Sequence, residues 1–234
     1  MGIVSANLGP LSDFWPTRRR AVSPQPDIIF INGYYTTPNC THKLIHWMGQ
    51  QGLACNVPDL GGLMGQWQTA RVKSSAAHLA AHLDSLSEGS KPWLVGHSLG
   101  GVIARYAIQE YNLDHRVSGV ITLGTPHRGV GAIGLVFLCG LGFLGPAAID
   151  MLPGSRVMKT FASVPWPFTI PLISIASTDD RLCPIDASRL GTDSAHNCRF
   201  IQIDSLGHNE LIRDESALVL LLKCITGKQP STMS

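Results

Sequence analysis

The stretch Pro92–Tyr111, PWLVGHSLGGVIARYAIQEY, decides the expected fold. It opens with the apolar run PWLV, turns through GHSLGG at residues 96–101, and continues as a helix-forming segment from Val102. A G-x-S-x-G pattern between a strand and a helix forces its serine into a strained turn that projects the hydroxyl above the sheet edge. The flanking glycines let strand and helix approach without side-chain collision. The pattern therefore predicts a nucleophile elbow with Ser98 at its tip.

Strand and helix signals alternate along the rest of the chain. Short apolar runs predict strands at 27–32, 54–58, 92–96, 117–123, 171–176 and 200–203, and helical patterns occupy 41–51, 69–88, 102–111 and 215–226. This order predicts an α/β fold, a mainly parallel sheet with helices on both faces. Because no repeat or linker divides the chain, we expect a single domain over 1–234, with 1–26 as a lead-in segment.

Composition excludes several classes of protein. Charged residues make up 15% of the 234 residues and hydrophobic residues 44%, whereas a disordered chain needs high charge and few apolar groups. The formal net charge is +2, and the one dense basic run is Arg18–Arg20. A nucleic-acid-binding protein carries a wider basic face, so no nucleic-acid partner is expected.

One segment interrupts the alternation. Residues 129–149 carry no charged side chain and include GLVFLCGLGFLG. Arg128 precedes this segment and Asp150 follows it. The length would suffice to span a bilayer, but glycines and a proline interrupt the segment, and its flanking elements must reach the same sheet. We therefore expect an apolar, lid-like insertion around 129–168 over a pocket; a membrane span or ordinary core are the alternatives.

The chain resembles the α/β-hydrolase superfamily, in its lipase and esterase branch, over residues 27–226. The GHSLGG elbow carries the resemblance together with LGTPHRG at 123–129, which is similar to the segment that ends the strand after the elbow helix in lipases. In this family the nucleophile, the acid and the histidine follow one another in that order along the chain. The resemblance implies a Ser-His-Asp catalytic triad that needs neither cofactor nor metal.

Each member of that triad has a candidate in this sequence. Ser98 is the nucleophile. Asp180 fits the D-x-aliphatic-x-P spacing of the family acid as DRLCP, and Asp179 is the alternative. His208 follows the last expected strand as Gly-His, whereas the rival base, His196, precedes that strand. In such a triad the imidazole accepts the serine proton, and the carboxylate holds the imidazole tautomer and stabilises its cation.

The oxyanion needs two donors, which the resemblance assigns to the backbone amides of Tyr34 and Leu99. The early strand ends in Asn32-Gly33 where many relatives have His-Gly, but a backbone donor does not depend on that side chain. Among the other histidines, four stand at i,i+4 spacings on expected helices: His42, His46, His78 and His82. No carboxylate or third ligand is placed near them in sequence, so no metal site is expected.

We therefore expect a serine hydrolase that cleaves esters of lipid-like or medium-chain acyl groups through an acyl-enzyme. An acyltransferase or amidase with the same triad, and a non-catalytic binding module, are the alternatives. The partner is a small-molecule or lipid ester, with transient contact to a lipid surface; the oligomeric state stays open. The start of the sequence does not read as a signal peptide, so a cytoplasmic protein with free thiols is expected, and a secreted mature form with Cys40–Cys55 or Cys183–Cys198 disulfides is the alternative.

Overall fold

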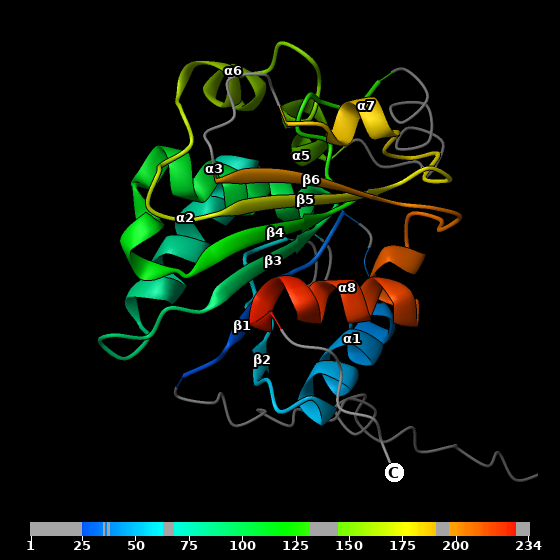
Figure 1. Ribbon diagram of the computed structural model, residues 1–234. Coiled ribbons are helices and arrows are strands. Elements are labelled where there is room, and N and C mark those ends of the chain that lie inside the picture. Colours follow the sequence, from blue (N-terminus) through cyan, green and yellow to red (C-terminus); the bar gives the residue numbers. More distant parts are fainter. Residues whose placement is uncertain are drawn as a thin grey trace, which may run out of the picture.

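The computed structural model describes residues 25–34, 36, 38–62, 68–131, 145–190 and 197–227. Six parallel strands form one sheet in the order β2-β1-β3-β4-β5-β6 (Figure 1). The strands are β1 (Ile28–Ile31), β2 (Cys55–Asn56), β3 (Trp93–His97), β4 (Gly119–Leu123), β5 (Leu172–Ser177) and β6 (Cys198–Ile203). Each expected strand is present, and the predicted α/β fold with a parallel sheet is confirmed.

Helices cover both faces of this sheet. The helices α1 (Pro38–Gln50) and α8 (Glu215–Thr226) pack on one face, and α2 (Val72–Asp84) and α3 (Leu99–Tyr111) pack on the other (Figure 1). The shorter elements are α5 (Pro146–Asp150), α6 (Arg156–Ser163) and α7 (Ile185–Ser188), with 3₁₀ turns η2 (Leu113–Arg116) and η3 (Glu210–Ile212). These shorter elements were not expected from the sequence, because each is too brief to show a helical period.

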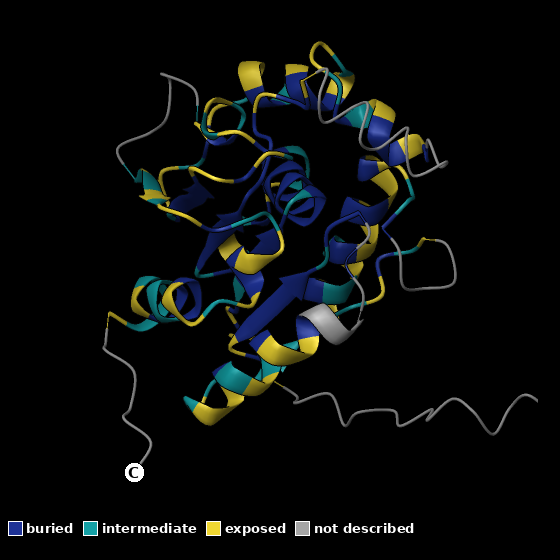
Figure 2. Cartoon of the chain, turned by 90° about the vertical axis from the view of Figure 1, so that its right-hand side faces the viewer, coloured by how far each residue is buried: buried dark blue, intermediate teal, exposed yellow. Residues whose placement is uncertain are grey.

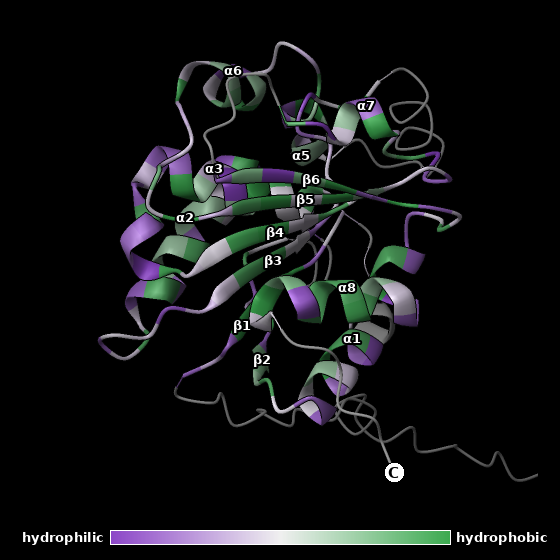
Figure 3. Ribbon diagram, viewed as in Figure 1, coloured by the Kyte–Doolittle hydropathy of each residue, from purple (hydrophilic) through white to green (hydrophobic). Residues whose placement is uncertain are grey.

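Strand side chains alternate between two cores because successive residues of a strand point to opposite faces. In β1, Ile29 and Ile31 belong to the core beneath α2 and α3, whereas Ile28 and Phe30 belong to the core beneath α1 and α8. The central strands are apolar on both faces (Figure 3) and buried, while the helices expose only their outer surfaces (Figure 2). A continuous apolar run is the expected sequence of such a doubly covered strand.

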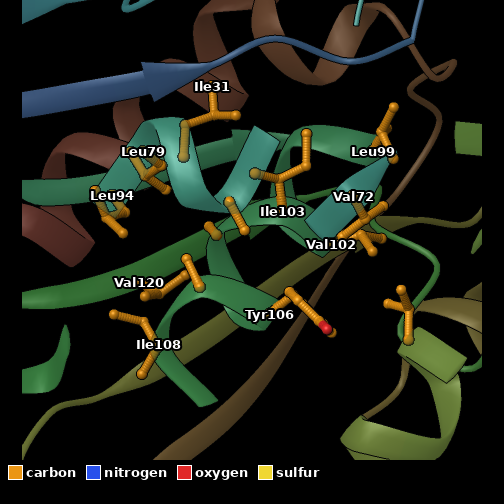
Figure 4. Close-up of a cluster of buried hydrophobic side chains, with 14 of the residues drawn as sticks. Ile31, Val72, Leu79, Leu94, Leu99, Val102, Ile103, Tyr106, Ile108 and Val120 are labelled. Atoms are coloured by element: carbon orange, nitrogen blue, oxygen red, sulfur yellow. The ribbon is translucent and has the colours of Figure 1, made fainter. Parts of the chain in front are cut away.

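Helix α3 lies at the centre of the larger core. Its residues 99–109 are all buried, and Val102, Ile103 and Tyr106 pack with side chains of β1, β3, β4 and α2 (Figure 4). The helix begins at Leu99, three residues before the expected start at Val102, because the glycines at 100 and 101 are positions of close backbone contact rather than helix breakers.

The expected insertion at 129–168 falls partly outside the described residues, which omit 132–144. Of the rest, α5 is tied to the start of α2: Asp150 accepts hydrogen bonds from Arg71 Nη1 and from the Val72 amide, both at 2.9 Å. The lid and the division into a lead-in and one domain therefore stay predictions. Among the residues that the structure describes, no helix has the length and apolar character needed to cross a membrane.

Candidate active site

Ser98 occupies the sharp turn between β3 and α3. Its backbone angles, φ 54° and ψ −121°, lie in a region that costs a non-glycine residue about 1–3 kcal/mol. Two hydrogen bonds hold the turn: the Ser98 amide donates to Leu123 O at 2.9 Å, and Thr125 Oγ1 donates to Ser98 O at 3.0 Å. The Ser98 hydroxyl forms no capping hydrogen bond with α3. Ser98 is the residue that precedes the first turn of α3, and the helix dipole favours negative charge at this end.

At each of the three glycines of the elbow, neighbouring atoms lie too close to leave room for a side chain. A Cβ atom on Gly96 would lie 2.4 Å from Gly101 N, and one on Gly100 would lie 2.1 Å from Ile31 O. A Cβ on Gly101 would lie 2.1 Å from Thr125 Oγ1. The glycines therefore allow α3 to begin directly against the ends of β1, β3 and β4.

Asp180 lies in the turn after β5 and is buried. Its Oδ1 atom accepts hydrogen bonds from the amides of Leu182 and Cys183, at 3.0 and 2.8 Å. Its Oδ2 atom lies 2.7 Å from His208 Nδ1. The carboxylate is thus fixed by backbone donors on one oxygen and directed at an imidazole with the other. Asp179, the sequence alternative, is exposed.

His208 follows β6, in a loop that is bonded to the acid turn. Ser177 Oγ accepts the Leu206 amide at 2.9 Å, and Thr178 Oγ1 accepts the Ser205 amide at 3.2 Å. Because Ser177 and Thr178 directly precede the acid turn, these bonds hold the acid and histidine loops in one arrangement.

The imidazole of His208 lies beside the elbow. Its ring centroid is 4.7 Å from that of His97, the residue before Ser98. A Cβ on Gly124 would lie 3.2 Å from His208 Nδ1, and Gly124 follows Leu123, whose carbonyl accepts the Ser98 amide. His208 therefore lies against the neighbours of Ser98 on both β3 and β4.

The proposed oxyanion donors lie at the ends of adjacent strands. Leu99 begins α3, and Tyr34 follows β1, which pairs with β3. The close approach of Gly100 to Ile31 brings these two segments together. The Tyr34 side chain is buried, and its hydroxyl accepts a hydrogen bond from the Gly145 amide at 2.7 Å. The loop that carries Tyr34 is thus joined to the segment that leads into α5.

Several other histidines have structural partners, whereas the buried Nε2 atom of His82 has no hydrogen-bond partner among the described residues. His127 Nε2 lies 2.9 Å from Thr122 Oγ1, and burial, reinforced by Arg105, holds the pKa of His127 well below its ordinary value. His78 Nδ1 lies 2.9 Å from Leu60 O, and the rings of His42 and His46 stack with centroids 6.1 Å apart. His196 lies outside the described residues. Within the described part of the chain, no group of three or more His, Cys, Asp or Glu side chains is placed to hold a metal ion.

Three aromatic residues, Phe161, Trp166 and Phe168, lie toward the end of the expected insertion. Phe161 packs 4.2 Å beneath the buried Arg105 guanidinium, and the Trp166 indole donates to Ile170 O at 2.8 Å. Phe168 is 77% exposed and lies in the segment that leads into β5. This segment is at the amino-terminal ends of the strands, whereas Ser98 is at their carboxyl ends. A groove of about 490 Å³ between α2, α3 and α6 includes Arg71, Lys73, Tyr106 and Arg156 in its lining, but not Ser98, Asp180 or His208.

Sequence reasoning did not assign roles to Gly124, Thr125 or Thr36. Gly124 and Thr125 lie within the quoted LGTPHRG segment, so a signal was present, but only the fold reveals that this segment abuts both the elbow and the Asp180–His208 pair. Thr36 has no motif around it and its position could not be inferred. Cys183 and Cys198 are free thiols, so the expected alternative of a disulfide between them is wrong.

Comparisons with known proteins identify chains of similar fold. The model of the palmitoyl protein thioesterase family matches residues 62–162, less than half of the chain, including the elbow. The lipase BlEst2 of Bacillus licheniformis, in its mature form, superposes with a TM-score of 0.67 at 19% identity, over 87% of this chain and 93% of its own. The monoacylglycerol lipase of Paleococcus ferrophilus gives 0.58 at 15% identity, over 86% and 94%.

A third solved structure, the α/β-hydrolase MGS-MChE2 from a lagoon-sediment metagenome, gives a TM-score of 0.63 at 17% identity, over 87% of this chain and 91% of its own. No curated protein matches the sequence. These likenesses show that the chain has the α/β-hydrolase fold, and the fold implied by the sequence resemblance is confirmed.

Proposed function

We propose that this chain is a serine hydrolase of carboxylic esters that acts through an acyl-enzyme intermediate. The observation that carries the proposal is the 2.7 Å contact between His208 Nδ1 and Asp180 Oδ2 beside the strained turn of Ser98. Because Nδ1 faces a carboxylate, it carries the proton, and Nε2 is left as the basic nitrogen. That tautomer is the one required to accept a proton from a serine hydroxyl.

In the proposed reaction, Ser98 Oγ attacks the substrate carbonyl while His208 Nε2 accepts its proton. The tetrahedral oxyanion receives hydrogen bonds from the amides of Leu99 and Tyr34. His208 then donates the proton to the leaving alcohol, and a water molecule repeats the sequence to release the acid and regenerate Ser98. Asp180 remains ionised throughout and stabilises the imidazolium.

The acyl group is proposed to be lipid-like. Two comparisons favour this: the family match is to palmitoyl protein thioesterases, and the structural relatives include lipases. The match to a thioesterase family also favours a second candidate function, hydrolysis of acyl thioesters, in which His208 protonates a thiolate leaving group instead of an alkoxide.

Hydrolysis of paired substrates tests both candidates. Oxygen esters and thioesters of acetyl, octanoyl and palmitoyl groups should be supplied to the parent chain and to Ser98→Ala. The proposal expects turnover that rises with acyl length and disappears in the variant. Preference for the thioester at equal acyl length would favour the second candidate. Binding of the acyl compounds without turnover by the parent would instead favour a non-catalytic module, and acyl transfer to added alcohols in place of hydrolysis would favour a transferase.

A further inference from the structure

A chain of three hydrogen bonds runs behind the candidate site. The Gly33 amide donates to Thr36 Oγ1 at 3.0 Å, Thr36 Oγ1 lies 3.3 Å from His97 Nδ1, and His97 Nε2 lies 3.0 Å from the backbone carbonyl of His208. Both side chains in this series are buried, Thr36 at 4% and His97 at 1% exposure. The hydrogen bonds therefore join the segment after β1 to the loop after β6 through the residue that precedes Ser98.

The direction of each bond follows from the groups involved. A carbonyl oxygen only accepts, so His97 Nε2 must carry a proton and donate to His208 O. With the ring neutral, Nδ1 is an acceptor, and the Thr36 hydroxyl donates to it. The Thr36 oxygen then accepts from the Gly33 amide. Burial and the nearby His208 lower the pKa of His97 to about 3, which keeps the ring in this neutral form at ordinary pH.

This series of hydrogen bonds connects the two catalytic arms of the site. Gly33 is the neighbour of Tyr34, whose amide is the proposed oxyanion donor, and His208 is the proposed base. Asp180 fixes only the His208 ring, through Nδ1, whereas His97 fixes the His208 backbone. Two attachment points, one on the ring and one on the main chain, define the imidazole position better than one.

On the basis of the proposed function, we propose that His97 and Thr36 are positioning residues that couple the oxyanion loop to His208. His97 is not a second base, because both of its ring nitrogens are engaged. The two side chains instead set the separation between the oxyanion donor and the base. A displacement of about 1 Å in such a site can cost on the order of a hundredfold in rate.

The competing explanation is that Thr36 and His97 only fill space. Gly33 is packed tightly against both, since a Cβ at Gly33 would lie 2.9 Å from Thr36 Oγ1 and 3.0 Å from His97 Nδ1. Two pairs of variants separate shape from hydrogen bonding. Thr36→Val keeps the shape and removes the hydroxyl, whereas Thr36→Ser keeps the hydroxyl. His97→Leu fills the space with an apolar side chain that forms no hydrogen bond, whereas His97→Gln retains an amide donor for the His208 carbonyl.

Steady-state kinetics on a p-nitrophenyl ester are the first measurement. Thr36→Val and His97→Leu are expected to lower kcat by roughly ten- to a hundredfold with KM changed by less than about twofold. Thr36→Ser and His97→Gln are expected to recover most of that loss. Equal rates for Thr36→Val and Thr36→Ser, with melting temperatures within a degree or so, would overturn the proposal and favour packing alone.

A second measurement does not need turnover. The proton on His208 Nδ1, held by Asp180, should give a downfield NMR resonance. Thr36→Val and His97→Leu should shift or broaden this resonance, and Thr36→Ser should restore it. If the parent lacks hydrolase activity but the resonance responds, the proposed function fails and the coupling stands. An active parent whose resonance is identical in Thr36→Val and Thr36→Ser would refute the coupling alone.

Discussion

Gly124 and Asp180 meet at a point where no side chain fits. A Cβ atom on Gly124 would lie 2.8 Å from Asp180 Oδ2, the oxygen that contacts His208, and Gly124 has a φ of +55°. Gly124 directly follows β4, whereas Asp180 follows β5, so two neighbouring strands of the sheet bring them together. Glycine at position 124 therefore leaves the space that the Asp180–His208 pair occupies.

The first prediction follows from this contact. Gly124→Ala should displace the Asp180 carboxylate and lower kcat by at least about tenfold, since a small misplacement of catalytic groups is costly. Gly89→Ala is the matched control, because Gly89 has a φ of +83° and a Cβ atom added there would meet nothing within 4 Å. Both variants should lose about 1–2 kcal/mol of unfolding free energy through backbone strain. Equal activity of the two variants would show that the contact does not matter for turnover.

The second prediction assigns the acid. Asp180→Asn should lower kcat by roughly a thousandfold or more, because an amide at this position favours the wrong imidazole tautomer. Asp179→Asn should change kcat by less than about twofold, since an exposed carboxylate interacts weakly through water. Steady-state kinetics of the two variants at equal folded concentration make the comparison. A larger loss in Asp179→Asn would reassign the acid.

The third prediction concerns strain at the elbow. Ser98 has a positive φ of 54°, which glycine adopts without penalty and alanine does not. Ser98→Gly should therefore be more stable than Ser98→Ala by about 1 kcal/mol or more, although both variants lack the hydroxyl and should lack turnover. Urea unfolding measures the difference. Equal stability of the two variants would indicate that the turn is not strained in solution.

The fourth prediction is a loss of stability in acid. Burial lowers the pKa of His97 from 6.5 to about 3 in the folded protein. Between these values the unfolded chain binds a proton that the folded chain does not, so stability is greatest above pH 6.5 and decreases as the pH falls toward 3. The slope from this histidine approaches about 1.4 kcal/mol per pH unit.

A denaturant series at several pH values tests this dependence. His97→Gln removes the titrating group, so the unfolding free energy of this variant should fall less steeply with acid than that of the parent. Carboxylates contribute to the acid response of both proteins, and the difference between the two slopes isolates His97. Identical slopes would mean that His97 is protonated in the folded protein.

The sequence was informative where local pattern and chemistry coincide. The elbow, the alternating strands and helices, and the turn DRLCP each carry a short-range signal, and all lie where expected. The choice of Asp180 over Asp179 depended on spacing within a single turn, and the structure places Asp180 against His208. Short helices such as α7 were missed because so few residues show no helical period.

The contacts behind the site could not be predicted. Thr36 and His97 are 61 residues apart, and His97 and His208 are 111 apart, so no local pattern links them. The insertion after LGTPHRG is a second case in which local sequence was not sufficient. Its apolar composition predicts burial but does not indicate the surface against which it packs.

The central claim is that Ser98 is a nucleophile activated by His208. Incubation with a fluorophosphonate, followed by intact mass and peptide mapping, measures this most directly because the reagent needs an activated serine and no specific acyl pocket. The account predicts one adduct on Ser98 in the parent, and a labelling rate at least about a hundredfold lower in His208→Ala. No adduct on Ser98 in the folded parent, or labelling of Ser98 at the same rate in both proteins, would contradict it.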